Sequence, residues 1–230
     1  MSKYDYFKEK KISFFGRLTH KVVQDKIVAF LQKEVVSGKI VLEIGPGVGG
    51  LAKLILDSGY TYMCVDRSET LIDSLVKLGI DAKYGEVPPL PYESSSVDCI
   101  VLMNVFEHMA DSEKALALLN EIYRVLKTNG KVLMLVPNCT GWGFDFYEVD
   151  YTHSFEISAE RMRQIFSDSN FHINSMSHTY GFLSGVVGFV CDKINNTVFS
   201  ILYQIFPLSS KMIKGKILFH PTLWIVGHKK

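Results

Sequence analysis

A short apolar stretch that runs into a cluster of glycines constrains the fold of this chain more than any other feature. Residues 41–50 read Val-Leu-Glu-Ile-Gly-Pro-Gly-Val-Gly-Gly, which predicts a strand followed by a tight turn. Glycine has no Cβ, so its backbone can take positive φ and approach a ligand closely. A helix expected from Gly49 to Ser58 would point the unpaired N–H groups of its first turn at the same place. Four glycines within residues 45–50 therefore indicate a ligand-binding loop rather than a simple turn.

The alternation of segments before Pro137 predicts a Rossmann-like α/β fold. Apolar runs predict strands at 39–44, 62–65, 80–84, 97–103 and 131–136, and amphipathic periodicity predicts helices at 19–36, 49–58, 70–78 and 111–127. Thr19 is the expected N-cap of the first helix, and Asn129-Gly130 the expected end of the last. Strands and helices that alternate at this spacing form a doubly wound parallel sheet, with ligands at the carboxyl ends of its strands.

The pattern changes after Pro137. Residues 138–157 are rich in glycine, aromatic and polar residues, which predicts an active-site loop. A helix at 158–166, a strand at 171–177 and a final antiparallel strand at 222–226 are expected beyond it. We therefore expect a single domain over residues 1–230, divided into N-terminal cap helices (1–38), a ligand-binding core (39–137) and a segment (138–230) with the substrate loop, an apolar helical insertion and the final strands.

Composition limits the classes of function. The 230 residues carry a net charge of +1, so no global field favours nucleic acid as a partner. The N-terminus has no apolar signal segment, which predicts a cytoplasmic protein. Four widely spaced cysteines indicate reduced, buried thiols rather than zinc ligands or disulfides: Cys64, Cys99, Cys139 and Cys191.

The apolar segment 182–206 has several open explanations. Asp192, Lys193 and two asparagines near its middle make it a poor membrane-spanning helix. No acidic residue follows Asp192, and six lysines do, so the last 38 residues carry +6 and the preceding 192 carry +1 − 6 = −5. An apolar helix with basic flanks predicts a peripheral contact through 182–216 with the inner face of the membrane, or a lid over an apolar substrate. Packing on its own domain or in a homodimer explains it equally well.

The glycine loop alone does not identify its ligand. Gly45-x-Gly47-x-x-Gly50 also fits the dinucleotide-binding fingerprint, and Asp66 follows Gly45 by 21 residues, where a ribose-binding acid is expected. Asp66 could accept hydrogen bonds from both ribose hydroxyls. Together with Glu43 and Glu86 it surrounds the predicted crevice with negative charge, which suits a cationic ligand better than a pyrophosphate.

Six sequence blocks in the correct order resemble class I S-adenosylmethionine-dependent methyltransferases, of the type 11, 12 and 23 groups. The blocks are Val41–Gly49, Val65-Asp66, Gly85–Tyr92, Val97–Val101, Asn104–Met109 and Arg124–Gly130. The resemblance implies a seven-stranded sheet, parallel except for one strand and flanked by helices, with S-adenosylmethionine as cofactor. It implies that the cofactor contacts Glu43, Gly45, Pro46, Gly47, Gly49, Asp66, Arg67, Glu86, Val87 and Asn104.

Two histidines are the candidate catalytic residues. A hydroxyl acceptor needs a base, and the imidazoles of His108 and His153 titrate near neutrality. Asp150-Tyr151-Thr152-His153, in which Asp150 could orient His153, resembles a segment of methyltransferases from surface-glycan and lipid-linked pathways. Glu107-His108 resembles a pair in quinone-biosynthesis O-methyltransferases, where a further acid three residues earlier helps to bind magnesium. Here that position is Asn104, a weaker ligand for a hard cation, so we expect no required metal.

Three functions remain open at this stage. The leading prediction is methyl transfer to a hydroxyl of a small molecule, a glycan or a lipid-linked intermediate. A nicotinamide-dependent oxidoreductase is the second, although a recognisable catalytic Tyr-x-x-x-Lys pair is missing from the sequence. The third is a non-catalytic adenosyl-binding or membrane-associated protein that keeps the fold.

Overall fold

The computed structural model describes residues 14–36, 38–205 and 220–230. The predicted cap within residues 1–13 therefore lies outside the described residues. In the described part, eight strands form one sheet in the order β3-β2-β1-β4-β5-β8-β6-β7. The strands are β1 (Ile40–Ile44), β2 (Thr61–Asp66), β3 (Asp81–Tyr84), β4 (Val97–Met103), β5 (Leu126–Pro137), β6 (Phe171–Tyr180), β7 (Leu183–Ser184) and β8 (Pro221–Lys229).

The sheet confirms the predicted Rossmann-like α/β class. Strands β1 to β5 pair in parallel, and β8 runs antiparallel to both β5 and β6. The two-residue strand β7 adds a short antiparallel edge to the seven expected strands.

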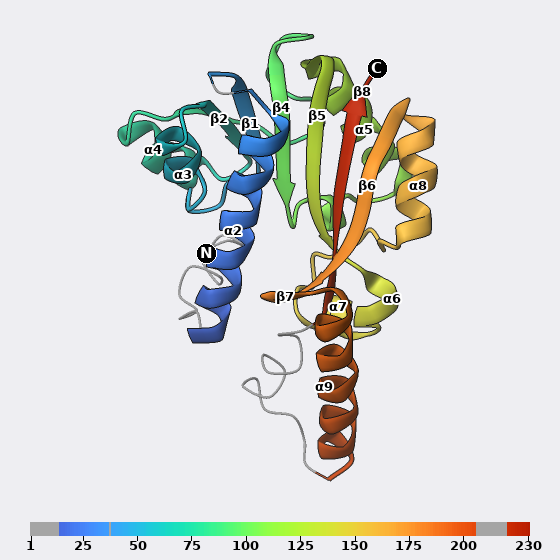
Figure 1. Ribbon diagram of the computed structural model, residues 1–230. Coiled ribbons are helices and arrows are strands. Elements are labelled where there is room, and N and C mark those ends of the chain that lie inside the picture. The colour runs from blue at the N-terminus through green and yellow to red at the C-terminus, as the bar shows by residue number, and fades with distance from the viewer. Residues whose placement is uncertain (1–13, 37, 206–219) are drawn as a thin grey trace.

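Helices cover both faces of the sheet (Figure 1). Helices α2 (Phe14–Glu34), α3 (Ala52–Asp57) and α4 (Glu69–Lys77) lie on one face, and α5 (Ser112–Val125) and α8 (Ala159–Asp168) lie on the other. The layers enclose two apolar cores, one that joins α5 and α8 to the sheet and one that joins α2 and α3 to it. Residues 99–102 of β4 are fully buried, as a central strand covered on both faces requires.

The remaining elements gather at the carboxyl ends of the parallel strands. They are the single-turn helix η1 (Phe106–His108), α6 (Cys139–Trp142), α7 (Asp145–Glu148) and α9 (Gly185–Ile205). Figure 1 shows α6, α7 and α9 at the end of the molecule to which β4 points, with α9 projecting from it. The segment expected to be one irregular loop at 138–157 therefore contains two short helices.

Two predicted boundaries are wrong for local reasons. Helix α2 already includes Phe14, so Thr19 lies inside it and not at its N-cap, and the buried Thr19 hydroxyl has no hydrogen-bond partner. Helix α5 ends at Val125, and β5 begins at once, with Asn129-Gly130 inside the strand. Asn129 adopts a φ of 61°, and the pairing of β4 with β5 shifts register between Val97 and Cys99. The Asn-Gly signal thus marks an irregularity within the strand rather than a helix end.

The four cysteines are all free. Cys64 and Cys99 are buried in the sheet, as expected, and Cys139 and Cys191 are partly exposed.

Candidate functional site

The glycine loop after β1 has a backbone that only glycine adopts easily. Gly45 has a φ of 72° and Gly47 a φ of 53°. A Cβ on Gly45 would lie 2.5 Å from the Val105 side chain, so the loop packs closely on the segment after β4. A Cβ on Gly47 would meet nothing within 4 Å. The loop therefore packs against the protein at Gly45 and faces open space at Gly47.

Glu43 lies buried beneath this loop. Its Oε2 accepts a hydrogen bond of 2.6 Å from the Tyr62 hydroxyl, and its Oε1 has no partner. Burial raises the pKa of Glu43 to about 7, although the Tyr62 hydrogen bond opposes the shift. A carboxyl oxygen without a partner at this depth is costly unless a bound group satisfies it.

Asp66 ends β2 and closes the loop from the other side. Its Oδ1 accepts a hydrogen bond of 2.8 Å from the backbone N–H of Ser68, and only 6% of the residue is exposed. Burial raises the pKa of Asp66, and the backbone N–H groups of Ser68 and Gly47 act in the opposite direction. The carboxylate is thus held beside the open face of the glycine loop.

A cavity of about 420 Å³ lies over these groups. Seven of the ten residues predicted to bind the cofactor line it: Gly45, Gly47, Asp66, Arg67, Glu86, Val87 and Asn104. Glu43, Pro46 and Gly49 do not line it. Pro46 is buried and its carbonyl accepts the Gly49 N–H at 2.9 Å, so these two residues shape the loop.

The cavity wall also contains residues that the sequence reasoning did not assign to the cofactor. Met109, Ala110 and Lys114 close one side, and Val105 closes the base next to Gly45. Their place in the sequence, from the Asn104–Met109 block to the start of α5, could have indicated that they line a ligand site. This segment follows the carboxyl end of a central strand, where ligands bind in such sheets.

An acid and two imidazoles adjoin this cavity. His108 lines the cavity, and its ring centroid lies 5.1 Å from that of His153. The His153 Nε2 lies 4.0 Å from Oε1 of Glu107, which is 1% exposed and whose Oε2 has no partner. Burial raises the pKa of Glu107 to about 8 and lowers the pKa of both histidines. Near neutral pH the two rings are therefore uncharged and able to accept a proton.

The surrounding loop fixes both rings. The His108 Nδ1 lies 2.7 Å from the Thr152 hydroxyl and 3.2 Å from its carbonyl oxygen. The His153 Nδ1 lies 2.5 Å from the Phe146 carbonyl oxygen. A carbonyl can only accept, so His153 Nδ1 carries the hydrogen and the neutral ring keeps its basic lone pair on Nε2.

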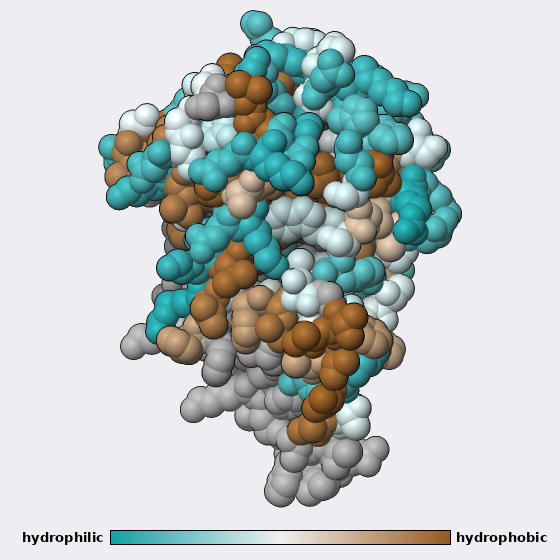
Figure 2. Space-filling view, in the orientation of Figure 1, coloured by the Kyte–Doolittle hydropathy of each residue, from teal (hydrophilic) through white to brown (hydrophobic). Residues whose placement is uncertain are grey.

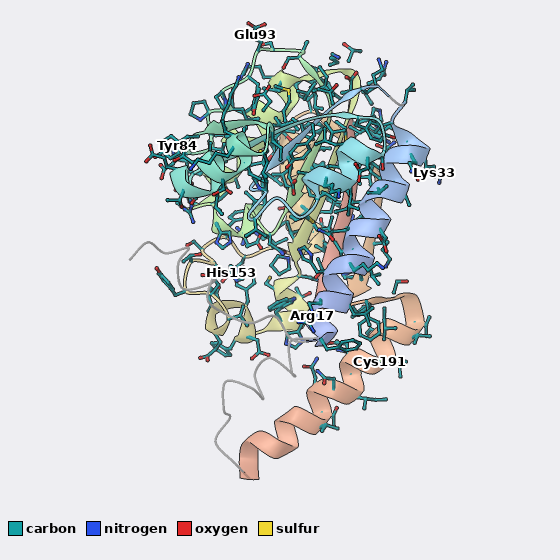
Figure 3. All side chains as sticks on the ribbon, turned by 90° about the vertical axis from the view of Figure 1, so that its left-hand side faces the viewer. Arg17, Lys33, Tyr84, Glu93, His153 and Cys191 are labelled. Carbon is teal, nitrogen blue, oxygen red and sulfur yellow. The ribbon has the colours of Figure 1, made fainter. Side chains whose placement is uncertain are left out.

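Asp150 does not hold His153 as the sequence suggested. Its Oδ1 accepts a hydrogen bond of 2.9 Å from the backbone N–H of Thr152, and it is the Phe146 carbonyl that orients the His153 ring. The carboxylate and the histidine lie in one tight turn, closed by the hydrogen bond from the His153 N–H to the Asp150 carbonyl, in which the Asp150 side chain turns toward the backbone. Figure 3 shows His153 at the same end of the molecule as Arg17 and α9, and Glu93 at the opposite end.

The same three side chains have the composition of a cation site. Glu107, His108 and His153 each offer one ligand atom, and these atoms lie within 4.8 Å of one another. The expectation that no metal is required stays a prediction.

A second, larger cavity of about 1020 Å³ lies between α2 and β6, with Phe30, Tyr180, Phe189 and Trp224 in its wall. Within the part of the chain that the structure describes, no predicted cofactor or catalytic residue lines it. The smaller cavity is the candidate active site because the acids, the glycine loop and the histidines meet there.

Comparison with known proteins agrees with this assignment. Residues 42–134 match the methyltransferase domain family. The chain is 36% identical over 113 residues to a tRNA (carboxymethyluridine(34)-5-O)-methyltransferase of Macaca fascicularis, covering 48% of this chain and 16% of that protein. It is 28% identical over 141 residues to a probable S-adenosylmethionine-dependent methyltransferase of Mycolicibacterium smegmatis, covering 60% and 53%. The chain spans only 16% to 53% of the lengths of four curated relatives that it matches.

A solved structure extends the likeness of fold to nearly the whole chain. Magnesium protoporphyrin IX methyltransferase from Synechocystis PCC 6803, with bound S-adenosylhomocysteine, superposes with a TM-score of 0.64 at 13% identity over 96% of this chain and 90% of that one. The domain match, the glycine loop and the acid-lined cavity agree in position. Residues 42–134 thus match a methyltransferase domain, and the findings together support a class I S-adenosylmethionine-dependent methyltransferase.

Proposed function

We propose that the protein transfers a methyl group from S-adenosylmethionine to a hydroxyl of a small molecule, a glycan or a lipid-linked acceptor. The observation that carries this proposal is the Glu107–His108–His153 cluster at the wall of the cofactor cavity. A cofactor site with a neutral imidazole beside it has the parts that alkylation of a hydroxyl needs: a methyl donor site and a proton acceptor.

The residues of the cavity fit the cofactor. Gly47 leaves room for close approach, Asp66 offers carboxylate oxygens to ribose hydroxyls, and the unpartnered Glu43 oxygen lies under the loop. Glu86 and Val87 would flank the adenine, and Asn104 would lie next to the sulfonium. When bound, the cofactor supplies a methyl group already activated for displacement by its positively charged sulfur.

The histidines would manage the proton of the acceptor. His153 Nε2 is the basic nitrogen, because Nδ1 donates to the Phe146 carbonyl. As the hydroxyl oxygen forms its new bond to carbon, its proton passes to this Nε2. The resulting imidazolium lies 4.0 Å from Oε1 of Glu107, an acceptor atom that favours the charged ring. His108 orients the acceptor between His153 and the cavity.

The charge distribution disfavours nucleic acid as the acceptor, although one relative is named as a tRNA methyltransferase. Residues 1–192, which contain the whole cavity, carry a net charge of −5. Binding to a phosphate backbone draws on lysine and arginine side chains, and an acidic surface opposes it. An uncharged or lipid-linked hydroxyl compound suits the negative charge of residues 1–192 better than a nucleic acid does.

A labelling experiment tests the proposal. The full chain is incubated with cofactor that carries an isotopic methyl group and with separate extracts of small metabolites, polar lipids, glycans and RNA, and products are followed by mass spectrometry. We expect label in the small-molecule, lipid or glycan fraction and none in RNA. Cofactor binding without label in any fraction would support the non-catalytic alternative and contradict the proposal.

A chelator separates acid–base catalysis from metal catalysis at the same cluster. If His153 acts as the base, activity survives removal of divalent cations. Loss of activity with chelator and its return with magnesium would assign Glu107, His108 and His153 to a cation instead.

A further inference from the structure

Helix α9 buries Asp192 on the side that faces the protein. Asp192 is 2% exposed, and its Oδ1 accepts a hydrogen bond of 2.9 Å from the Asn196 side chain. The same oxygen lies 3.4 Å from Nδ1 of the buried His220. These contacts join α9 to the start of β8, 28 residues further along the chain.

His220 also connects α9 to the loop beside the active site. Its Nε2 lies 2.8 Å from Oδ2 of Asp145 in α7, and its ring packs edge-on against Trp142 of α6. The Trp142 indole N–H donates to the Pro221 carbonyl at 2.8 Å. The rotation of α9 about its own axis is therefore fixed, and with it the side that faces away from the protein.

The outward side has an apolar stripe. Val187, Val190, Ile194 and Val198, at spacings of three, four and four residues, are 64%, 46%, 60% and 47% exposed. This spacing aligns them in one stripe along the helix. Figure 2 shows hydrophobic side chains stacked along the projecting part of α9. A helix on a water-exposed surface normally has the opposite arrangement, with its polar side outward.

Positive charge accompanies this stripe. Lys193 borders it, with Nζ 5.4 Å from the centre of the Phe189 ring. In the sequence, residues 206–219 directly after α9 include three lysines and no acidic residue. A lysine can extend from an apolar helix face toward phosphate headgroups while its methylene stem stays in apolar surroundings. Basic segments next to an apolar helix are attracted to anionic membrane surfaces.

We propose that α9 docks this protein on an anionic lipid bilayer, with Val187, Val190, Ile194 and Val198 inserted between the headgroups and Lys193 on the phosphates. Among the described helices, none combines the length and apolar character that crossing a bilayer requires. The helix lies at the strand ends where the cofactor cavity is formed, so docking turns that end of the protein toward the membrane (Figure 1). The proposal does not depend on methyl transfer.

The charge favours lipid over a second copy of the chain. Two copies paired through this stripe would bring the Lys193 side chains of both copies to one interface, which costs energy by like-charge repulsion. Stable interfaces are centred on aromatic and arginine side chains, and the stripe consists of valine and isoleucine alone. An anionic surface instead complements the lysines.

Vesicle sedimentation of the full chain tests the proposal. The probes are vesicles of phosphatidylcholine alone and of phosphatidylcholine with phosphatidylglycerol. We expect binding to the anionic vesicles, weaker at high salt, and at least about tenfold weaker for Val190→Asp/Ile194→Asp, which loses two inserted side chains. The control Val76→Asp/Leu78→Asp adds the same charge at exposed apolar positions of and beside α4 and should bind like the wild type.

Three results would overturn the proposal. The first is wild-type protein that stays in the supernatant with anionic vesicles. The second is equal loss of binding in both double variants. The third is a dimer, measured by light scattering without lipid, that Val190→Asp/Ile194→Asp converts to monomer, since the stripe would then be a contact between copies. Retention of the circular dichroism spectrum and of the cofactor-induced rise in Tm shows that each variant is folded.

Discussion

Two parts of this chain, the first half (residues 42–134) and the second half (residues 138–230), differ in their similarity to known proteins. They also differ in how far their contacts could be predicted from the sequence. Residues 42–134 match a family, and they contain the glycine loop, Asp66 and the cavity around them. Residues 138–230 lie outside that match. They contain His153, helix α9 with its exposed apolar stripe, and the His220 contacts. The first half carries the cofactor cavity, and we propose that the second half carries the proton acceptor and the membrane contact. The halves should therefore fail in different ways when altered.

The largest expected effect is on turnover, from the second half. His153→Ala removes the proposed base, so we expect the rate of methyl transfer to the labelled acceptor to fall by about 100-fold or more, with little change in cofactor affinity. His172→Ala, on the exposed start of β6, is the matched control and should leave the rate unchanged. An unchanged rate in His153→Ala would show that the acceptor needs no base from this side chain.

The next effect is on cofactor binding, from the first half. Asp66→Ala removes the carboxylate beside the glycine loop, so we expect cofactor affinity to fall by about 100-fold, as the loss of two charge-assisted hydrogen bonds would produce. Isothermal titration calorimetry measures this loss. Glu93→Ala, at the far end of the molecule, is the control (Figure 3). Equal affinity in wild type and Asp66→Ala would remove the basis for assigning this cavity to the cofactor.

A smaller effect, on the pH dependence of stability, arises from the buried Glu107 of the first half, which lies near His153 of the second. Burial raises its pKa from 4.5 to about 8, so between these pH values the unfolded chain releases a proton that the folded chain keeps. The Glu107 contribution to stability therefore falls as pH rises through this window, and is constant above it. Glu107→Gln, which is neutral throughout, should show a shallower loss of Tm from pH 5 to about 8, and Glu93→Gln should follow the wild type. Parallel Tm curves for Glu107→Gln and wild type would contradict a raised pKa.

The smallest effect compares one helix cap from each half. The Asp111 side chain accepts the Lys114 N–H at 2.8 Å, and the Ser158 hydroxyl accepts the Arg161 N–H at 3.2 Å. Replacing either by alanine should lower the free energy of unfolding by about 1 kcal/mol, measured by urea denaturation. Cofactor affinity should not change in Ser158→Ala. A change in affinity with Ser158→Ala would mean that the second half shapes the cofactor site.

The same division explains what could be predicted from the sequence. The strand, the glycines and Asp66 lie in one βαβ unit, so short-range patterns were enough to predict their meeting at the sheet edge. The contact of His153 with the Phe146 carbonyl depends on the path of a loop with two short helices, which residue type and spacing do not specify. The contact of His220 with Asp145 joins residues 75 positions apart, and no local pattern indicates it.

Helix α9 shows the limit of periodicity as a guide. Its apolar residues correctly predicted a helix. The apolar side of a helix is ordinarily expected to face the protein interior. The structure instead buries Asp192 against His220 and leaves the valines outside. Only the partners of the polar residues, which come from other elements, decide which side faces in.

Calorimetric comparison of S-adenosylmethionine with NADH tests the central assignment most directly, because the glycine loop and Asp66 fit the fingerprints of both ligands. We expect S-adenosylmethionine to bind to the wild type, S-adenosylhomocysteine to displace it, and NADH to do neither. Binding of NADH in preference to S-adenosylmethionine would contradict the cofactor assignment and favour hydride transfer.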